Sequence, residues 1–106
     1  MINIKNITIE KDEDNKYITK GLLKENHKEI LINLDLNKEL VNQIIEIIVK
    51  KINDGEQIIN KYLDIDEISC PLYIKENTNN LQVIFPDPFI KFPWEPDCQE
   101  TYKNQL

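Results

Sequence analysis

An amphipathic helix is predicted by the stretch Leu40-Val41-Asn42-Gln43-Ile44-Ile45-Glu46-Ile47-Ile48-Val49-Lys50-Lys51-Ile52. Apolar residues recur there every three or four positions, and polar residues occupy the opposite side. Just before it, Asn37 is a suitable N-cap, and Glu39 places a negative charge in the first turn, where it suits the helix dipole. We therefore expect a helix that begins after Asn37 and packs its apolar side on the rest of the molecule.

The end of this helix is ambiguous in the sequence. Residues 53–56 read Asn-Asp-Gly-Glu, and glycine is a poor helix former. Beyond them, however, Ile58, Ile59, Tyr62 and Leu63 continue the same apolar stripe. A kinked helix and two stacked helices fit this pattern equally well.

Three strands are predicted before the helix. Residues 2–9 alternate apolar and polar residues but change phase at Lys5 and Asn6, which indicates a strand with a bulge or a twist. Residues 17–24 and 28–36 are the next two candidates, joined by a short turn. We expect these strands to form an antiparallel meander.

Two further strands are predicted after the helix. Residues 68–74 and 81–85 alternate, and the polar residues 76–80 between them suit a turn, so they indicate a second hairpin. Pro71 is best tolerated at a sheet edge. The expected fold is a single α+β domain over residues 1–106, with an antiparallel sheet of about five strands in the order βββαββ packed on one long or kinked helix. Residues 86–106 form its irregular C-terminal segment.

Composition argues against several functions. The 106 residues carry 19 acidic and 13 basic side chains, a formal charge of −6, and every basic residue is Lys. Such a charge opposes binding to a phosphate backbone, and no glycine-rich loop is present to hold a cofactor phosphate. We expect no nucleic-acid partner and no cofactor. The N-terminus lacks the apolar core of a signal peptide and no run is long enough to span a membrane, so we also expect a cytoplasmic protein with no membrane partner and reduced cysteines.

The sequence contains no recognisable catalytic or metal-binding set. His27 falls in a predicted turn among charged residues, and Cys70 and Cys98 do not form a CxxC motif. The acidic runs 12–14 and 64–67 lack the spacing and the glycine of a calcium-binding loop, so solvated turns are the simpler interpretation. We expect a protein without catalytic residues and without a metal site.

The most unusual segment is the aromatic and proline-rich tail. All three Phe, the only Trp and four of the five Pro lie between residues 85 and 96. One interpretation is that the tail closes the open face of the sheet, which has no second helical layer. The other is that Phe92 and Trp94 form an aromatic anchor with an acidic rim that contacts a basic protein. The candidate partner-binding residues are Asp64, Asp66, Glu67, Phe92, Trp94, Glu95 and Asp97.

The order of elements, the stretch Lys20-Gly21-Leu22-Leu23 and the tail motif Pro93-Trp94-Glu95-Pro96 together resemble small uncharacterised bacterial immunity-type proteins of polymorphic toxin systems. This resemblance implies a stoichiometric inhibitor that binds a cognate toxin and has no catalytic residues. An acidic inhibitor of this kind would suit a basic toxin domain.

Two other functions stay open. A small-molecule-binding or hydrolytic domain would have its pocket between the concave face of the sheet and the helix, lined by Tyr17, Tyr62, Tyr73 and the tail aromatics. A structural homodimer would pack the tail of one subunit on the other. Monomer and homodimer are both compatible with the sequence.

Overall fold

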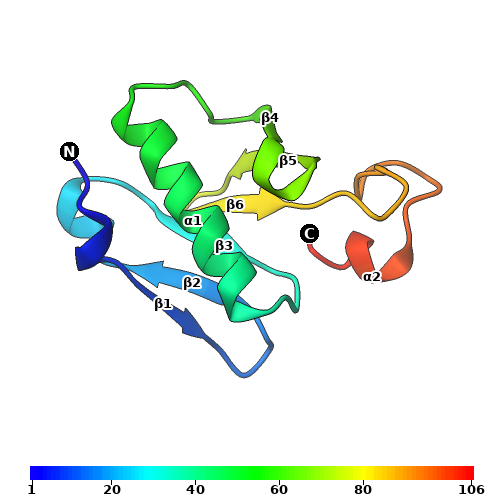
Figure 1. The fold of residues 1–106 in the computed structure, drawn as a ribbon. Coiled ribbons are helices and arrows are strands. Elements are labelled where there is room, and N and C mark those ends of the chain that lie inside the picture. Colours follow the sequence, from blue (N-terminus) through cyan, green and yellow to red (C-terminus); the bar gives the residue numbers. More distant parts are fainter.

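The computed structural model describes residues 1–106 as a six-stranded sheet with one long helix, α1 (Lys38–Asn53), across one of its faces (Figure 1). The strands are β1 (Thr8–Lys11), β2 (Tyr17–Lys20), β3 (Glu29–Ile32), β4 (Lys61–Ile65), β5 (Cys70–Glu76) and β6 (Asn80–Ile84). Their order in the sheet is β1-β2-β3-β6-β5-β4. The predicted α+β class is confirmed, with six strands in place of about five.

The sheet is mixed, which corrects the expectation of a purely antiparallel one. β3 and β6 are parallel neighbours, with Ile30 opposite Leu81 and Ile32 opposite Val83. The chain leaves β3, crosses the sheet as α1, forms β4 and β5 at the far edge and returns as β6 beside β3. A parallel pair needs such a long crossover connection, and α1 supplies it.

Helix α1 begins and ends through local hydrogen bonds. The Asn37 side chain accepts a hydrogen bond from the Leu40 N–H at 2.8 Å, so the predicted N-cap is confirmed. At the other end Gly55 adopts a φ of +80°, and the N–H groups of Gly55 and Glu56 donate to the carbonyls of Ile52 and Lys51. This pattern is a Schellman motif, which ends the helix.

The expectation that a helix continues through residues 58–63 is therefore wrong. After the Schellman motif the chain extends into β4, whose Leu63 and Ile65 point into the core while Tyr62 and Asp64 lie on the other face. Over so short a run, a helical stripe and a strand alternation share many positions. The stop at Gly55 decides between them.

Strand bounds differ elsewhere too, since β2 and β3 end at Lys20 and Ile32, earlier than predicted, and β5 runs on to Glu76. The phase change at Lys5 and Asn6 is a 3₁₀ turn (Ile4–Asn6) in place of a bulge, so β1 starts only at Thr8. Pro71 lies in β5, an interior strand, but at its end, where only β4 is paired with it. The proline therefore costs no ladder hydrogen bond to β6, whose pairing with β5 begins at Tyr73.

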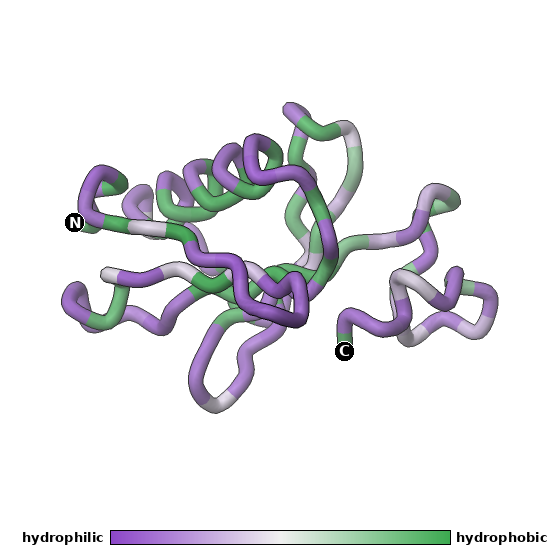
Figure 2. The backbone as a smooth tube through the Cα atoms, turned by 90° about the horizontal axis from the view of Figure 1, so that it is seen from below, coloured by the Kyte–Doolittle hydropathy of each residue, from purple (hydrophilic) through white to green (hydrophobic).

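The main core lies between α1 and the sheet. Figure 2 shows the hydrophobic side of α1 turned toward the strands. The buried residues of the helix pack on alternate residues of the central strands, and the fully buried members include Val41, Ile32, Leu72, Ile74 and Val83. Tyr17 belongs to this core as well, and its hydroxyl donates to the Leu36 carbonyl at 2.6 Å.

Residues 86–106 turn back onto the face of the sheet that α1 does not cover. This segment is irregular except for the single helical turn α2 (Glu100–Lys103). The side chains of Asn33 and Gln82, which both lie on that face, donate to the Gln105 carbonyl. Ile84, Phe92 and Cys98 are buried outside the main core, and we refer to these three residues together as the second core.

Candidate functional site

Four aromatic rings gather where the tail meets β4 and β5. Tyr62 and Tyr73 are directly opposite each other in the β4–β5 pair, with ring centroids 4.8 Å apart. Trp94 stacks on Phe92 with centroids 5.1 Å apart and planes only 7° from parallel, and it meets Tyr73 edge to face at 5.1 Å. We call Tyr62, Tyr73 and Trp94, with Phe92 beneath them, the aromatic surface.

The members of the aromatic surface differ in exposure. Tyr62 is 56% exposed and Trp94 46% exposed, whereas Phe92 is only 5% exposed. The prediction that the tail closes the open face is right for Phe92, whereas Trp94 stacks on Phe92 but stays about half exposed. Phe85 lies instead in the main core on the helix side, and Phe89 remains in solvent. The sequence did not separate these four residues, because which of them is covered depends on contacts with distant strands.

Beside the rings is an open hollow of about 590 Å³. It is lined by Asn60, Tyr62, Tyr73, Lys75, Glu76, Trp94 and Leu106. Its position corrects the predicted pocket between sheet and helix, because that space is filled by the main core. Tyr17, expected in the same pocket, lies on the opposite face of the sheet and is buried.

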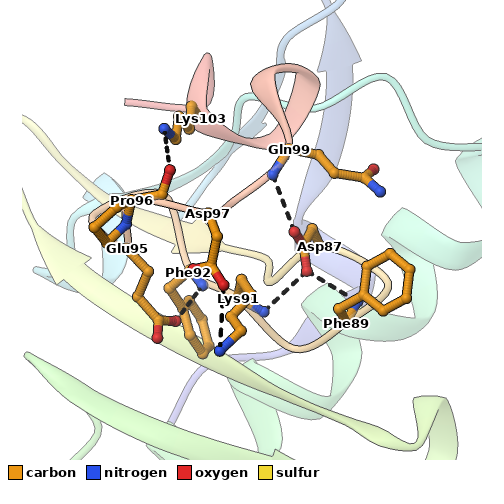
Figure 3. Close-up of polar contacts among 9 residues, drawn as sticks. All are labelled: Asp87, Phe89, Lys91, Phe92, Glu95, Pro96, Asp97, Gln99 and Lys103. Carbon is orange, nitrogen blue, oxygen red and sulfur yellow. Dashed lines mark hydrogen bonds and ion pairs between the residues drawn. The ribbon is translucent and has the colours of Figure 1, made fainter.

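The tail is organised by Asp87, which the sequence analysis did not single out. Its carboxylate accepts hydrogen bonds from the N–H groups of Phe89, Lys91 and Gln99 at 2.9, 2.9 and 3.0 Å (Figure 3). Burial opposes the charged form, but these three N–H groups and the nearby Lys91 charge outweigh it and hold the pKa of Asp87 below its usual value. The pattern Pro-Asp-Pro was the available signal, since Asp commonly accepts backbone N–H bonds within turns.

The predicted acidic rim of the tail is only partly available to a partner. Glu95 accepts the Phe92 N–H at 2.7 Å, so its carboxylate supports the turn that carries Trp94. Asp97 is 68% exposed and lies 3.6 Å from the Lys91 ammonium (Figure 3). Phe92, predicted as part of an exposed anchor, instead supports the Trp94 ring from below. Of the predicted tail contacts, Trp94 and Asp97 face solvent.

The other predicted contacts lie along and just after β4. Asp64 is exposed on the same face of β4 as Tyr62, two residues away. Asp66 and Glu67 are exposed in the 3₁₀ turn (Asp66–Ile68) that follows. These three acids line a hollow of about 240 Å³ with Lys50 and Lys51 of α1. The edge strand β4 therefore connects the aromatic surface to this acidic region.

Residues with chemical potential elsewhere are dispersed. His27 lies in the turn between β2 and β3, where its Nδ1 is 2.7 Å from the Lys28 carbonyl. Cys98 is buried and Cys70 half-buried; burial raises the pKa of both thiols. No group of three or more His, Cys, Asp or Glu side chains is close enough to hold a metal ion. No helix has the length and apolar composition that a membrane span requires.

A buried carboxylate is the other residue that sequence reasoning missed. Glu29 accepts a hydrogen bond from the Thr19 hydroxyl at 2.8 Å and from the N–H groups of Gly21, Leu22 and Leu23. All its oxygens are thus engaged in holding the turn between β2 and β3. Glu29 is a structural acid, with no accessible oxygen left for chemistry.

Comparisons with protein-family models, curated proteins and solved structures find no match to this chain.

Proposed function

We propose that this chain is a non-catalytic protein-binding module that contacts its partner through the aromatic surface. The observation that carries the proposal is the half-exposure of Tyr62 and Trp94 in a cluster whose rings brace one another. Large aromatic side chains with few rotatable bonds supply much of the energy of protein interfaces. Rings fixed by neighbours lose little further freedom when a partner binds.

Charge favours a basic partner. The molecule carries a formal charge of −6, and exposed acids lie near the aromatic surface, namely Asp64 on the same face of β4 and Asp66 and Glu67 just beyond it. Acidic groups around an apolar anchor accelerate encounter with a basic protein and repel acidic ones. Binding should therefore weaken as salt concentration rises.

The more specific proposal is an immunity protein or antitoxin that inhibits a cognate basic toxin. It rests on the resemblance in element order and in the Pro93-Trp94-Glu95-Pro96 motif, together with the acidic surface. If the toxin is a nuclease, the acids of this chain would compete for the groove that holds substrate phosphates.

The test is co-expression with the protein encoded by the adjacent gene, followed by co-purification and a toxicity assay. The proposal predicts a complex and suppressed toxicity. Trp94→Ala should weaken the complex at least about 30-fold, as for an interface hot spot. Leu23→Ala is the matched control, because Leu23 is 67% exposed but lies in the turn between β2 and β3, remote in sequence from the aromatic surface.

The melting temperature of each variant decides how the result is interpreted. Lost binding with an unchanged melting temperature identifies Trp94 as an anchor, whereas an equal loss of stability makes it part of the second core. If the neighbour neither co-purifies with the wild-type chain nor changes in toxicity, the proposal fails.

A second candidate function is small-molecule binding in the hollow beside Tyr62, Tyr73 and Trp94, whose volume of about 590 Å³ is in the range of ligand sites. Because Trp94 is the only tryptophan, its fluorescence reports directly on occupancy of this hollow. A thermal-shift screen with metals and metabolites tests this alternative. Uniformly flat melting curves together with unchanged Trp94 emission count against it.

A further inference from the structure

The strand β4 forms one edge of the sheet and has a neighbour on one side only. It pairs with β5, and no strand lies beyond it. Along such an edge every second residue directs its N–H and its carbonyl outward, where they meet water or a further strand. The pairing of β4 with β5 determines which residues these are.

The outward-facing backbone groups of β4 belong to Tyr62 and Asp64. Asp64 lies opposite Pro71, which has no N–H, so the two residues form a pair of the non-hydrogen-bonded kind. Hydrogen-bonded and non-hydrogen-bonded pairs alternate along an antiparallel ladder. Tyr62, opposite Tyr73, is therefore of the same kind as Asp64, and both residues direct their N–H and carbonyl groups away from β5.

A second observation agrees with this assignment. The Ile74 carbonyl accepts the Asn60 N–H at 2.7 Å, so Ile74 directs its backbone groups toward β4 and the preceding residue of β5 directs its own toward β6. No backbone group of a turn, a loop or the tail is hydrogen bonded to the backbone of Tyr62 or Asp64. The N–H and carbonyl groups of these two residues are therefore free to pair with an added strand.

The side chains of the same two residues continue the aromatic surface along this edge. Tyr62 and Asp64 are exposed on one face of β4, whereas Leu63 and Ile65 alternate with them and are buried on the other. The Tyr62 ring belongs to the aromatic surface, so the unpaired edge adjoins it. Asp64 takes part in no ion pair, and Lys61, the one basic residue of β4, lies on the face of Leu63. The Asp64 charge is thus available to a partner.

We propose that an extended, basic segment of the partner protein adds to the sheet as a further strand beside β4. Its backbone pairs with the N–H and carbonyl groups of Tyr62 and Asp64, and its side chains at alternate positions lie beside the same two residues. A Lys or Arg beside Asp64 makes a cross-strand ion pair, and one over the exposed Tyr62 ring makes a cation–π contact. This inference rests on the proposed function for the basic character of the partner, and it adds the conformation in which that partner binds.

The choice of this edge and this occupant follows from the side chains. The other edge strand, β1, contains no aromatic residue, and its Lys11 ammonium lies 3.2 Å from the Asp35 carboxylate. A second copy of β4 does not suit the edge, because each copy brings a formal charge of −6 and another Asp64. A basic segment has the opposite charge and meets both an acid and an exposed ring.

Amide hydrogen exchange measured by nuclear magnetic resonance tests the proposal on the full chain. The probe is a peptide of alternating Lys and Val at millimolar concentration. The control peptide has the same side chains but a methyl group on the backbone nitrogen of every Lys, which removes the N–H groups directed at β4. The probe should slow exchange of the Tyr62 and Asp64 amides at least about threefold, and the control should not. The Leu63 and Ile65 amides face β5 and should not change.

Charge reversal separates the edge from the overall charge of the molecule. Asp64→Lys places a like charge beside the basic strand and should raise the dissociation constant of the probe about fivefold or more. Glu13→Lys changes the net charge equally at an exposed acid in the turn between β1 and β2. This matched control should change the dissociation constant less than about twofold.

The same exchange measurement on the complex with the adjacent-gene protein distinguishes this inference from the proposed function. Slower exchange of both amides in that complex supports the added strand. A complex that depends on Trp94 but leaves both amides unprotected overturns the added strand and retains the binding module. If no complex forms, the proposed function fails and the peptide decides alone, so that unchanged exchange at Tyr62 and Asp64 overturns the inference as well.

Three further results would overturn the added strand. Exchange that slows equally in β1 would show pairing with any sheet edge. Equal slowing by the methylated peptide would show that backbone pairing is not involved. Slowing that appears in the protein alone as its concentration rises would identify a second copy of the chain as the occupant.

Discussion

At the scale of single residues, Asp87 determines the shape of the tail. One carboxylate gathers three backbone N–H groups from positions up to 12 residues away. The loop that exposes Phe89 and the turn that leads to α2 both depend on it. A charged acceptor bonded to backbone donors is stronger than a neutral one, and here it replaces regular secondary structure.

Asp87→Asn should lower the melting temperature in a pH-dependent way. The amide nitrogen cannot accept the Gln99 N–H, so one partly buried donor loses its partner. Because the folded pKa of Asp87 lies below the unfolded value of about 3.9, its stabilisation is present above that pH and is lost as pH falls through the folded pKa. Thermal melts between pH 7 and pH 2 should show that the difference in melting temperature between wild type and variant closes below about pH 4.

Asp97→Asn is the matched control at an exposed acid in the same segment. Its ion pair with Lys91 lies in solvent, so the variant should change stability by less than about 1 kcal/mol at any pH. If the melting temperatures of wild type and Asp87→Asn differ by the same amount down to pH 2, the assigned role of the carboxylate is contradicted.

At the scale of elements, two side-chain amides make the paired backbone hydrogen bonds that a neighbouring strand would otherwise make. The Gln105 amide accepts the Phe85 N–H at 2.8 Å and donates to the Phe85 carbonyl at 2.7 Å. Asn53, at the end of α1, makes the same paired bonds with the Ile2 backbone at 2.8 Å each. Each amide pairs with the N–H and the carbonyl of a residue outside the strands. Gln105 thereby anchors the C-terminal segment, and Asn53 anchors the N-terminus.

Gln105→Ala should destabilise the protein by about 2–4 kcal/mol, because the buried N–H and carbonyl of Phe85 lose their partner together. Gln99→Ala is the control: Gln99 lies in the same segment with an exposed side chain, and its loss should cost less than about 0.5 kcal/mol. Urea unfolding followed by circular dichroism measures both. Equal effects of the two substitutions would show that Gln105 does not anchor the segment.

At the scale of the whole molecule, the sheet is covered on both faces by different means. The helix α1 covers one face with aliphatic side chains, and the irregular tail covers the area around β4, β5 and β6 on the other with Phe92, Trp94 and Gln105. The two cores share the strands between them. Removing either cover therefore exposes part of the same sheet.

Phe92→Ala should destabilise the protein by about 3 kcal/mol, because it leaves a cavity in the second core, whereas Phe89→Ala should cost less than about 0.5 kcal/mol. In wild type, Trp94 fluorescence and far-ultraviolet circular dichroism should report the same urea midpoint, since tail and sheet unfold together. A lower urea midpoint for Trp94 fluorescence than for circular dichroism would mean that the tail unfolds independently of the sheet.

The sequence by itself determined the elements whose signals are local. The Asn37 cap and the apolar spacing of residues 40–52 located α1, and simple alternation located the β5–β6 hairpin. A long helix after Asn37 and the α+β class followed from these patterns, but the end of the helix at Asn53 did not. Such features depend on residues a few positions apart, which is the range over which caps and periodicities act.

Only the tertiary structure decided which elements are neighbours and which tail residues face solvent. The β3–β6 pairing joins residues about 50 positions apart, and Asn33 meets Gln105 across 72 positions. The same distant packing buries Phe92, leaves Phe89 and Trp94 at the surface and places the strand over residues 61–65 at the edge of the sheet. No local pattern encodes these outcomes, because each depends on which distant surface becomes available to cover a given side chain.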